Sequence, residues 1–238
     1  MEMIILTSSL TILLYGFLIG LKHATDVDHL AAVSTIVAEK KNLLASISIG
    51  GLWGFGHTIS LTVAGIFVLF LNFEISERTE KILELCVGIM LVVLGLNVFR
   101  KLLKGATIHI HEHSHGKHKH THFHIHEPNE EESSESHHRL DLSPRALVVG
   151  MIHGLAGSAG LMLIVIPTIE SKIVGLLYIL VFGIGSIGGM TLMSLLISLP
   201  FALTSKNFIQ INKILQGSAA LFSVFLGFYI MYEIASTL

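Results

Sequence analysis

Six long apolar stretches constrain this 238-residue chain more than any other feature of its sequence. A helix needs about 20 predominantly apolar residues to cross the hydrocarbon of a bilayer, and several stretches reach that length. Only 13% of the residues are charged, against about a quarter in soluble domains, and they gather in clusters between the stretches. The stretches cover residues 4–22, 43–71, 82–103, 146–168, 173–203 and 208–232. The sequence therefore predicts an all-α polytopic membrane protein with about six transmembrane helices.

Two segments depart from plain membrane helices. Residues 24–38, which follow the first apolar stretch, form a candidate short second helix before the charges at 39–41. The stretch 43–71 exceeds the length that a bilayer requires and contains the letters GGLWGFGH. Because glycine lowers the cost of unusual backbone conformations, this density predicts a bend or an unwound segment there.

The chain also resembles itself at a nearly constant spacing. Three short matches occur in the same order, at offsets of 130, 133 and 132 residues. They pair GLKH at 20–23 with GMIH at 150–153, GHT at 56–58 with GMT at 189–191, and KIL at 81–83 with KIL at 213–215. Three spans per half is an odd number, so the second half is expected to enter the membrane upside down. Inverted repeats with glycine-broken helices are typical of secondary transporters.

These patterns divide the chain into three parts. Residues 1–104 are predicted to be the first three-helix repeat, and 144–238 the second, inverted one. Between them, 105–143 form a histidine-rich loop. Loops one, three and five carry eleven Lys and Arg residues, whereas loops two and four carry three. The positive-inside rule therefore predicts that the odd-numbered loops are cytoplasmic and that both termini lie outside the inner membrane.

The most unusual polar cluster lies in the stretch GLKHATDVDHLAAV, residues 20–33. It contains His23, Asp26, Asp28 and His29 directly after an apolar run, and His57 lies in the glycine-rich part of the next stretch. Ionisable side chains at membrane depth are costly and usually functional. Imidazole and carboxylate together suit Ni²⁺, Co²⁺, Zn²⁺ or Cu²⁺. These five residues are therefore the predicted metal ligands.

Helical geometry leaves two arrangements of the aspartates open. On an unbroken helix, His23, Asp26 and His29 share an arc of about 120° while Asp28 points elsewhere. If the helix unwinds around 24–28, Asp28 can join both histidines. The role of His153 also stays open between metal ligand and helix packing. Because simple alignment places Ser158 and Ala159 opposite Asp28 and His29, and Met190 opposite His57, the metal chemistry is expected mainly in the first half.

The loop at 109–126 holds nine histidines in eighteen positions, and His137 and His138 follow. Such tracts bind metals. Their alternation suits one side of an extended chain, but polar low-complexity composition favours disorder over the whole of 105–143. The expected role is to buffer or pass on a metal ion in the cytoplasm, with cytoplasmic nickel chaperones as candidate partners.

Several function classes are disfavoured. A net charge of −2 and the absence of a basic surface argue against nucleic acid, and the single Cys86 cannot build a thiolate site. No Gly-x-x-x-x-Gly-Lys-Ser/Thr motif is present to bind a nucleotide, and no HExxH motif suggests a metalloenzyme. The expected protein is therefore not an enzyme, has no prosthetic group and works in a lipid bilayer.

At these residues the sequence resembles the nickel/cobalt transporter family, the NiCoT-type permeases. The resemblance lies in His23, four residues and then Asp28-His29, together with Gly56-His57-Thr58 in the following stretch. It is closest to a short six-span branch associated with urease and other nickel enzymes. The resemblance implies a permease for Ni²⁺, and Co²⁺ as a further substrate, with His23, Asp28, His29 and His57 handling the metal. The alternatives kept open are Ni²⁺/Co²⁺ efflux and metal sensing without flux.

Overall fold

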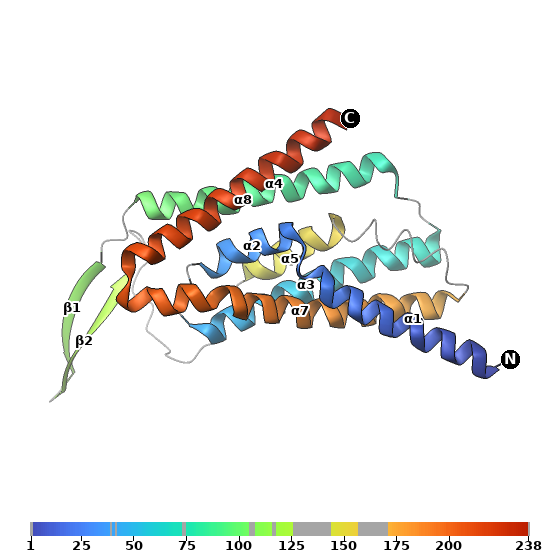
Figure 1. Cartoon of the computed structure of the whole chain (residues 1–238), viewed down its shortest axis with the longest axis horizontal. Helices are drawn as coiled ribbons and strands as arrows, with labels where there is room; N and C mark the ends of the chain where they lie inside the picture. The colour runs from blue at the N-terminus through green and yellow to red at the C-terminus, as the bar shows by residue number, and fades with distance from the viewer. Residues whose placement is uncertain are drawn as a thin grey trace.

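The computed structural model describes residues 2–38, 40, 42–72, 75–104, 108–115, 118–125, 144–156 and 171–237. Within these ranges the chain forms seven helices and one two-stranded sheet (Figure 1). The helices are α1 (Glu2–His23), α2 (Val27–Val37), α3 (Leu43–Leu71), α4 (Glu77–Leu103), α5 (Pro144–Ala156), α7 (Lys172–Asn207) and α8 (Ile209–Thr237). The strands are β1 (Ile108–His115) and β2 (His118–Ile125).

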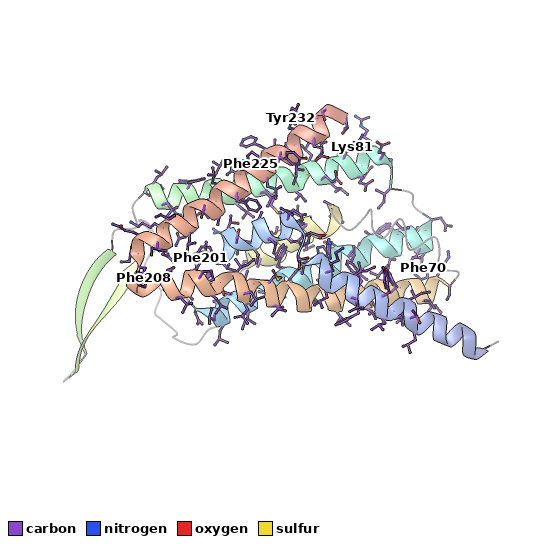
Figure 2. All side chains as sticks on the ribbon, in the orientation of Figure 1. Phe70, Lys81, Phe201, Phe208, Phe225 and Tyr232 are labelled. Carbon is purple, nitrogen blue, oxygen red and sulfur yellow. The ribbon has the colours of Figure 1, made fainter. Side chains whose placement is uncertain are left out.

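Four of these helices, α3, α4, α7 and α8, are long and apolar enough to cross a membrane. The short helix predicted after the first span exists as α2, and α1 with α2 passes the same test as one span bent by 54°. Large apolar side chains cover the outside of the bundle, and Phe225 and Tyr232 project outward from α8 (Figure 2). The chain is therefore a multi-pass membrane protein. The fourth predicted stretch begins in α5, but its remainder, 157–168, lies outside the described residues.

The helices pack in two groups. Helices α1, α3, α5 and α7 form the larger group, in which α3 packs against both α7 and α5, and α1 packs against α7. Helices α4 and α8 cross each other as a separate pair along the upper side of Figure 1. Helix α2 lies between the groups, in contact with α7, α8 and α4. The buried apolar core follows this contact between the groups and includes Ala32, Ile49, Trp53, Leu91 and Met190.

The unwound segment that the sequence allowed in α3 is not present, because α3 is helical without interruption from Leu43 to Leu71. Its glycines serve close helix packing instead. A Cβ on Gly56 would collide with the backbone of α5 at Leu147, and one on Gly54 would lie 2.7 Å from the Cα of Ile187 in α7. Small residues let helix backbones approach closely inside a membrane. The chain breaks earlier, between α1 and α2.

Two close helix contacts join matching positions of the two halves of the chain. In one contact the glycine lies in the first half, and in the other it lies in the second half. A Cβ on Gly20 of α1 would collide with the backbone of Phe182 in α7, and one on Gly150 of α5 with that of Trp53 in α3. Gly20 and Gly150 are 130 residues apart, and Trp53 and Phe182 are 129 apart. The contact of α1 with α7 is therefore equivalent to that of α5 with α3.

A second pair of contacts follows the same rule in α4 and α8. A Cβ on Gly95 would lie 2.6 Å from the carbonyl oxygen of Ala220, and one on Gly227 would lie 2.5 Å from that of Gly88. Gly88 and Ala220 are 132 residues apart, and so are Gly95 and Gly227, which is the offset found in the sequence. Each of the two contacts therefore becomes the other when every residue is replaced by the one 132 positions away. The two halves thus contact each other through equivalent residues.

The histidine-rich loop contains regular structure where disorder was expected. Strands β1 and β2 pair in antiparallel register, and four rungs of the ladder join two histidines. These rungs are His109 with His124, His111 with His122, His113 with His120, and His115 with His118. The histidines alternate with residues such as Ile110, Thr121 and Phe123, and β-branched and aromatic residues favour strands. Residues 105–107, 116–117 and 126–143 lie outside the described part of the chain.

We predict that Gly56→Ala lowers the stability of the folded protein by about 1–3 kcal/mol, because the added methyl group meets backbone that cannot rotate away. Gly188→Ala is the matched control on α7, since a Cβ there meets nothing within 4 Å. It should leave the stability unchanged or raise it by up to about 1 kcal/mol, through helix propensity alone. Thermal unfolding in detergent, followed by circular dichroism, measures both. Equal unfolding temperatures for the two variants would contradict the packing role of Gly56.

Candidate metal centre

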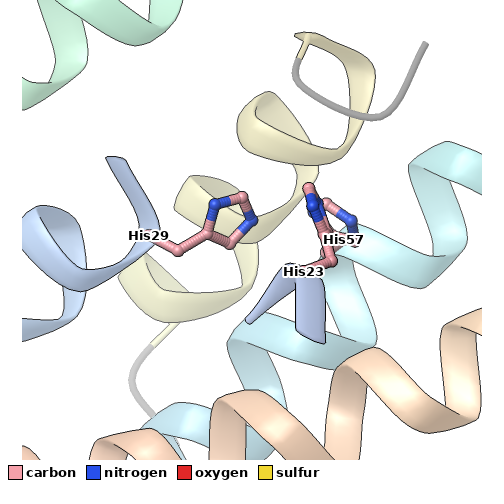
Figure 3. Close-up of side chains that lie close together, drawn as sticks. All are labelled: His23, His29 and His57. Atoms are coloured by element: carbon pink, nitrogen blue, oxygen red, sulfur yellow. The ribbon is translucent and has the colours of Figure 1, made fainter. Parts of the chain in front are cut away.

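Four histidines meet in the middle of the bundle. Eleven of the fifteen histidines lie between residues 109 and 138, and these four are all the others. They are His23, His29, His57 and His153, and none is more than 3% exposed. The ring of His29 lies 4.4 Å from that of His23 and 4.1 Å from that of His153, measured between centroids. Figure 3 shows His23, His29 and His57 gathered around one small region.

The break between α1 and α2 brings His23 and His29 together. Helix α1 ends at His23, and α2 begins at Val27 after a turn whose last residue, Asp26, has extended backbone (φ −64°, ψ 146°). On a continuous helix, residues six apart lie on different turns about 9 Å apart along the axis. The 54° bend removes that separation. Two imidazoles from neighbouring helices therefore face one another.

Close packing of α3 and α5 supplies the other two histidines. His57 lies near the middle of α3 and is completely buried. A Cβ on Gly154 would collide with the carbonyl oxygen of His57, so only glycine allows α5 this close. His153, the preceding residue, enters the cluster through this approach.

Two carboxylates hold three of the four rings. His23 donates from Nδ1 to Asp26 at 2.7 Å. His29 donates from Nδ1 to one oxygen of Asp28 at 3.1 Å, and His153 donates from Nε2 to the other oxygen at 2.7 Å. Such bonds fix the ring orientation and tautomer, and they commonly support metal-binding histidines. Each supported ring is left with its second nitrogen free to bind an ion.

Those second nitrogens have no hydrogen-bond partner. Among the described residues, the unpartnered buried atoms include Nε2 of His23, Nε2 of His29, both ring nitrogens of His57 and Nδ1 of His153. A buried polar atom without a partner costs about 1–3 kcal/mol. Several at one place call for an explanation such as an ion. A metal cation that binds these nitrogens would remove the cost.

Two groups of three residues have the spacing of a metal site. In the first triad, His23, His29 and His57 each offer a nitrogen, and these atoms lie within 4.8 Å of one another. Metal–nitrogen bonds of about 2.1 Å put two nitrogens on one ion at most about 4.2 Å apart. Small ring movements would therefore enclose a transition metal.

The second triad consists of Asp28, His29 and His153, within the same limit. It shares His29 with the first triad and adds His153, a candidate ligand from the second half of the chain. The sequence analysis left the role of His153 open. One sequence signal could have identified His153: the match of GLKH with GMIH, at an offset of 130, aligns His153 with His23.

All five residues predicted from the sequence lie at this cluster, and four of them belong to one or both of the two triads. The helix break is present, and Asp28 bonds to His29 as expected. Its second partner is His153 instead of His23, which bonds to Asp26. Asp26 contacts His23 but belongs to neither triad, and its side chain is 45% exposed. The ligand role of these residues remains a prediction.

The expectation that the metal chemistry lies mainly in the first half stays a prediction, but the structure brings His153 of the second half into the cluster. The packing also changes which residue of the second half aligns with His57. Gly54 contacts Ile187 and Gly183 contacts Thr58, which sets the offset between α3 and α7 at 129 rather than 133. His57 therefore corresponds to Ser186, one helical turn before Met190.

Trp53, the single tryptophan of the chain, offers a direct measurement of this cluster. Its ring is 1% exposed and lies 5.4 Å from His29 and 5.7 Å from His153. We predict that Ni²⁺ or Co²⁺ quenches its fluorescence in a saturable way, because ions with partly filled d shells quench a nearby indole. The d¹⁰ ion Zn²⁺ should quench it far less.

The control for this titration is a full-length variant with all eleven histidines between 109 and 138 replaced by serine. Quenching should persist there and be lost on adding His29→Ala. Quenching that disappears with the loop histidines alone would place the ion outside the cluster.

Comparisons with known proteins give the family. The family described as the cytochrome c biogenesis protein transmembrane region matches residues 30–229. The chain is also 37% identical to the urease accessory protein UreH of Bacillus sp. (strain TB-90), over 96% of this chain and 93% of that protein. No solved structure matches. The family match includes His57 and His153 and begins just after His29, whereas the similarity to UreH extends over nearly the whole chain. By these matches the chain belongs to the family of the cytochrome c biogenesis protein transmembrane region.

Proposed function

We propose that this protein is a secondary transporter that imports Ni²⁺, and Co²⁺ as a further substrate, across the cytoplasmic membrane. One observation carries the proposal: buried imidazoles with unpartnered nitrogens converge at a helix break inside a membrane-spanning bundle. Ionisable residues inside a membrane commonly mark an ion pathway. Three nitrogen donors suit a transition metal better than Mg²⁺ or Ca²⁺, which prefer oxygen.

The packing supports a transporter of two inverted repeats with six spans. The contact of α1 with α7 has its equivalent in that of α5 with α3, and the paired contacts of α4 with α8 exchange in the same way. Transporters built from such repeats bind substrate near the midplane, at discontinuous helices, and alternate access by rocking one part against the other. The break between α1 and α2 lies at the histidine cluster.

The membrane potential suffices as the energy source. Moving one charge through 100 mV is worth about 2.3 kcal/mol, so a divalent cation gains about 4.6 kcal/mol. That energy corresponds to a gradient of about a thousandfold. In the proposed orientation, with odd-numbered loops cytoplasmic and the termini outside, the inside-negative potential drives the cation inward.

The histidine-rich loop fits the cytoplasmic end of this path. Its four histidine–histidine rungs place imidazole-bearing residues opposite one another along β1 and β2. We assign to it the buffering of arriving metal and its transfer to cytoplasmic nickel chaperones. The similarity to a urease accessory protein favours nickel as the cargo, since urease is a nickel enzyme. It also supports the proposed association with urease. The relation to the nickel/cobalt permeases rests on the motif around His23 and His29 and is part of the proposal.

We predict that His23→Ala and His29→Ala each abolish uptake of ⁶³Ni²⁺ into proteoliposomes carrying an inside-negative potential. Each change removes a ring of the first triad, and the remaining donors cannot replace the lost hydration shell. Ser218→Ala is the control on a spanning helix, since its hydroxyl bonds only to carbonyls of its own helix. Wild-type flux equal to that of empty vesicles would refute the transport function, and expulsion of metal from cells would establish efflux.

Deletion of residues 109–138 should leave appreciable ⁶³Ni²⁺ uptake in the same vesicles. The four histidines of the cluster lie outside this segment, so the permeation site stays intact. In cells, the deletion should lower the amount of metal retained after uptake. Complete loss of vesicle flux would make the loop part of the transport path.

A further inference from the structure

The two triads of the histidine cluster overlap in one residue and differ in the halves of the chain that build them. His29 belongs to both. The first triad takes its other members, His23 and His57, from α1 and α3, so the whole triad lies in the first half. The second triad takes His153 from α5, across the contact between the halves. Movement of α5 relative to α2 therefore changes the second triad, whereas the first triad contains no residue of α5.

The second triad already has short donor separations. Nδ1 of His29 lies 3.1 Å, and Nε2 of His153 lies 2.7 Å, from the carboxylate oxygens of Asp28. Two donors bound to one transition metal lie about 3 Å apart, given bonds of about 2.1 Å. The donor atoms therefore need to move little, but each imidazole has to shift its proton to the opposite ring nitrogen, which has no hydrogen-bond partner. This position would have two nitrogens and one anionic oxygen, whereas the first triad has three neutral nitrogens.

We propose that Asp28, His29 and His153 form a second binding position for the transported cation, filled from the first triad through His29. The two ring nitrogens of His29 face different parts of the cluster. Nδ1 bonds to Asp28, and Nε2 lacks a hydrogen-bond partner. The ring of His29 therefore lies between the two positions and supplies one nitrogen to each, so the cation exchanges Nε2 for Nδ1 when it moves to the second position.

The charges of the two positions favour this order. The first triad contributes no negative charge of its own, although Asp26 supports it through His23. The second provides the carboxylate of Asp28, which offsets part of the charge of a dication where water is excluded. Movement of α5 away from α2 would withdraw His153 and leave Asp28 and His29 as an incomplete site. The second position therefore couples release of the cation to movement of α5. This role in transport rests on the proposed function, whereas binding at the second position does not.

The test measures binding of Co²⁺ to purified full-length protein in which the eleven loop histidines are serine. Co²⁺ absorption bands report the ligand set, and X-ray absorption counts the imidazoles on the metal. His57→Ala should still bind one Co²⁺, now with two imidazoles and one carboxylate. His153→Gln alone should keep the three-imidazole site. The Gln amide can still donate to Asp28 and so preserves the packing.

The double variant His57→Ala/His153→Gln tests whether His153 belongs to a second binding position. We expect it to bind Co²⁺ about tenfold to a hundredfold more weakly than His57→Ala, the usual range for loss of a metal-site interaction. Equal affinity and spectrum in the two variants would overturn the second position. If the double variant does not fold, as judged by circular dichroism and gel filtration, His23→Ala/His57→Ala replaces it, because this variant keeps only the second triad complete: two imidazoles with a carboxylate on Co²⁺ support the proposal, and any other set overturns it.

Flux separates this proposal from the transport function. In proteoliposomes, His153→Gln should lower the maximal rate of ⁶³Ni²⁺ uptake while Co²⁺ affinity at the first triad stays within about twofold of the wild type. A wild-type maximal rate in that variant would exclude a role of the second position in transport. Absence of flux in the wild type would refute the transporter and leave the binding result valid.

Discussion

The burial of four imidazoles in one apolar bundle is the constraint on which the rest of this structure depends. Their ring nitrogens cannot reach water, and the carboxylates of Asp26 and Asp28 satisfy only one nitrogen on each of three rings. A fold designed only for stability would avoid such atoms, since each costs free energy. The cost is understandable if the remaining nitrogens bind a cation that crosses the membrane. The break between α1 and α2 and the close approach of α5 both serve this convergence.

Glycine makes the convergence feasible. Gly56 and Gly154 let the backbones of α3 and α5 meet, and this contact brings His153 to the carboxylate of Asp28. The equivalent contact between α1 and α7 occurs at Gly20. The same kind of helix contact thus occurs twice, but among the described residues the second half contributes one side chain, His153, to the two candidate triads. Its counterpart to His57 is Ser186, whose hydroxyl donates to the carbonyl of Gly20 at 3.3 Å. The halves share a scaffold and differ in chemistry.

Much of the site could be predicted from local pattern. Ionisable residues beside an apolar run pointed to His23, Asp28 and His29, and the short helix after the first span was predicted correctly. The unwound segment allowed for α3 did not form, because glycine-rich sequence occurs both at helix breaks and in close helix packing, and only the neighbouring helix distinguishes the two. The register between α3 and α7 was placed one turn too far, since a shift of four residues keeps nearly the same helix face.

By itself, the sequence determined that the chain is a membrane protein and where its long helices lie to within about five residues. It also identified the ionisable side chains whose burial in a membrane is costly. These properties depend on residues near one another along the chain. Only the tertiary structure decided that His153 joins the cluster, that Asp28 contacts two rings at once and that His29 belongs to two triads. The contact of Asp28 with His153 joins residues 125 positions apart. It depends on how the surfaces of the packed helices fit together. No local pattern carries that information.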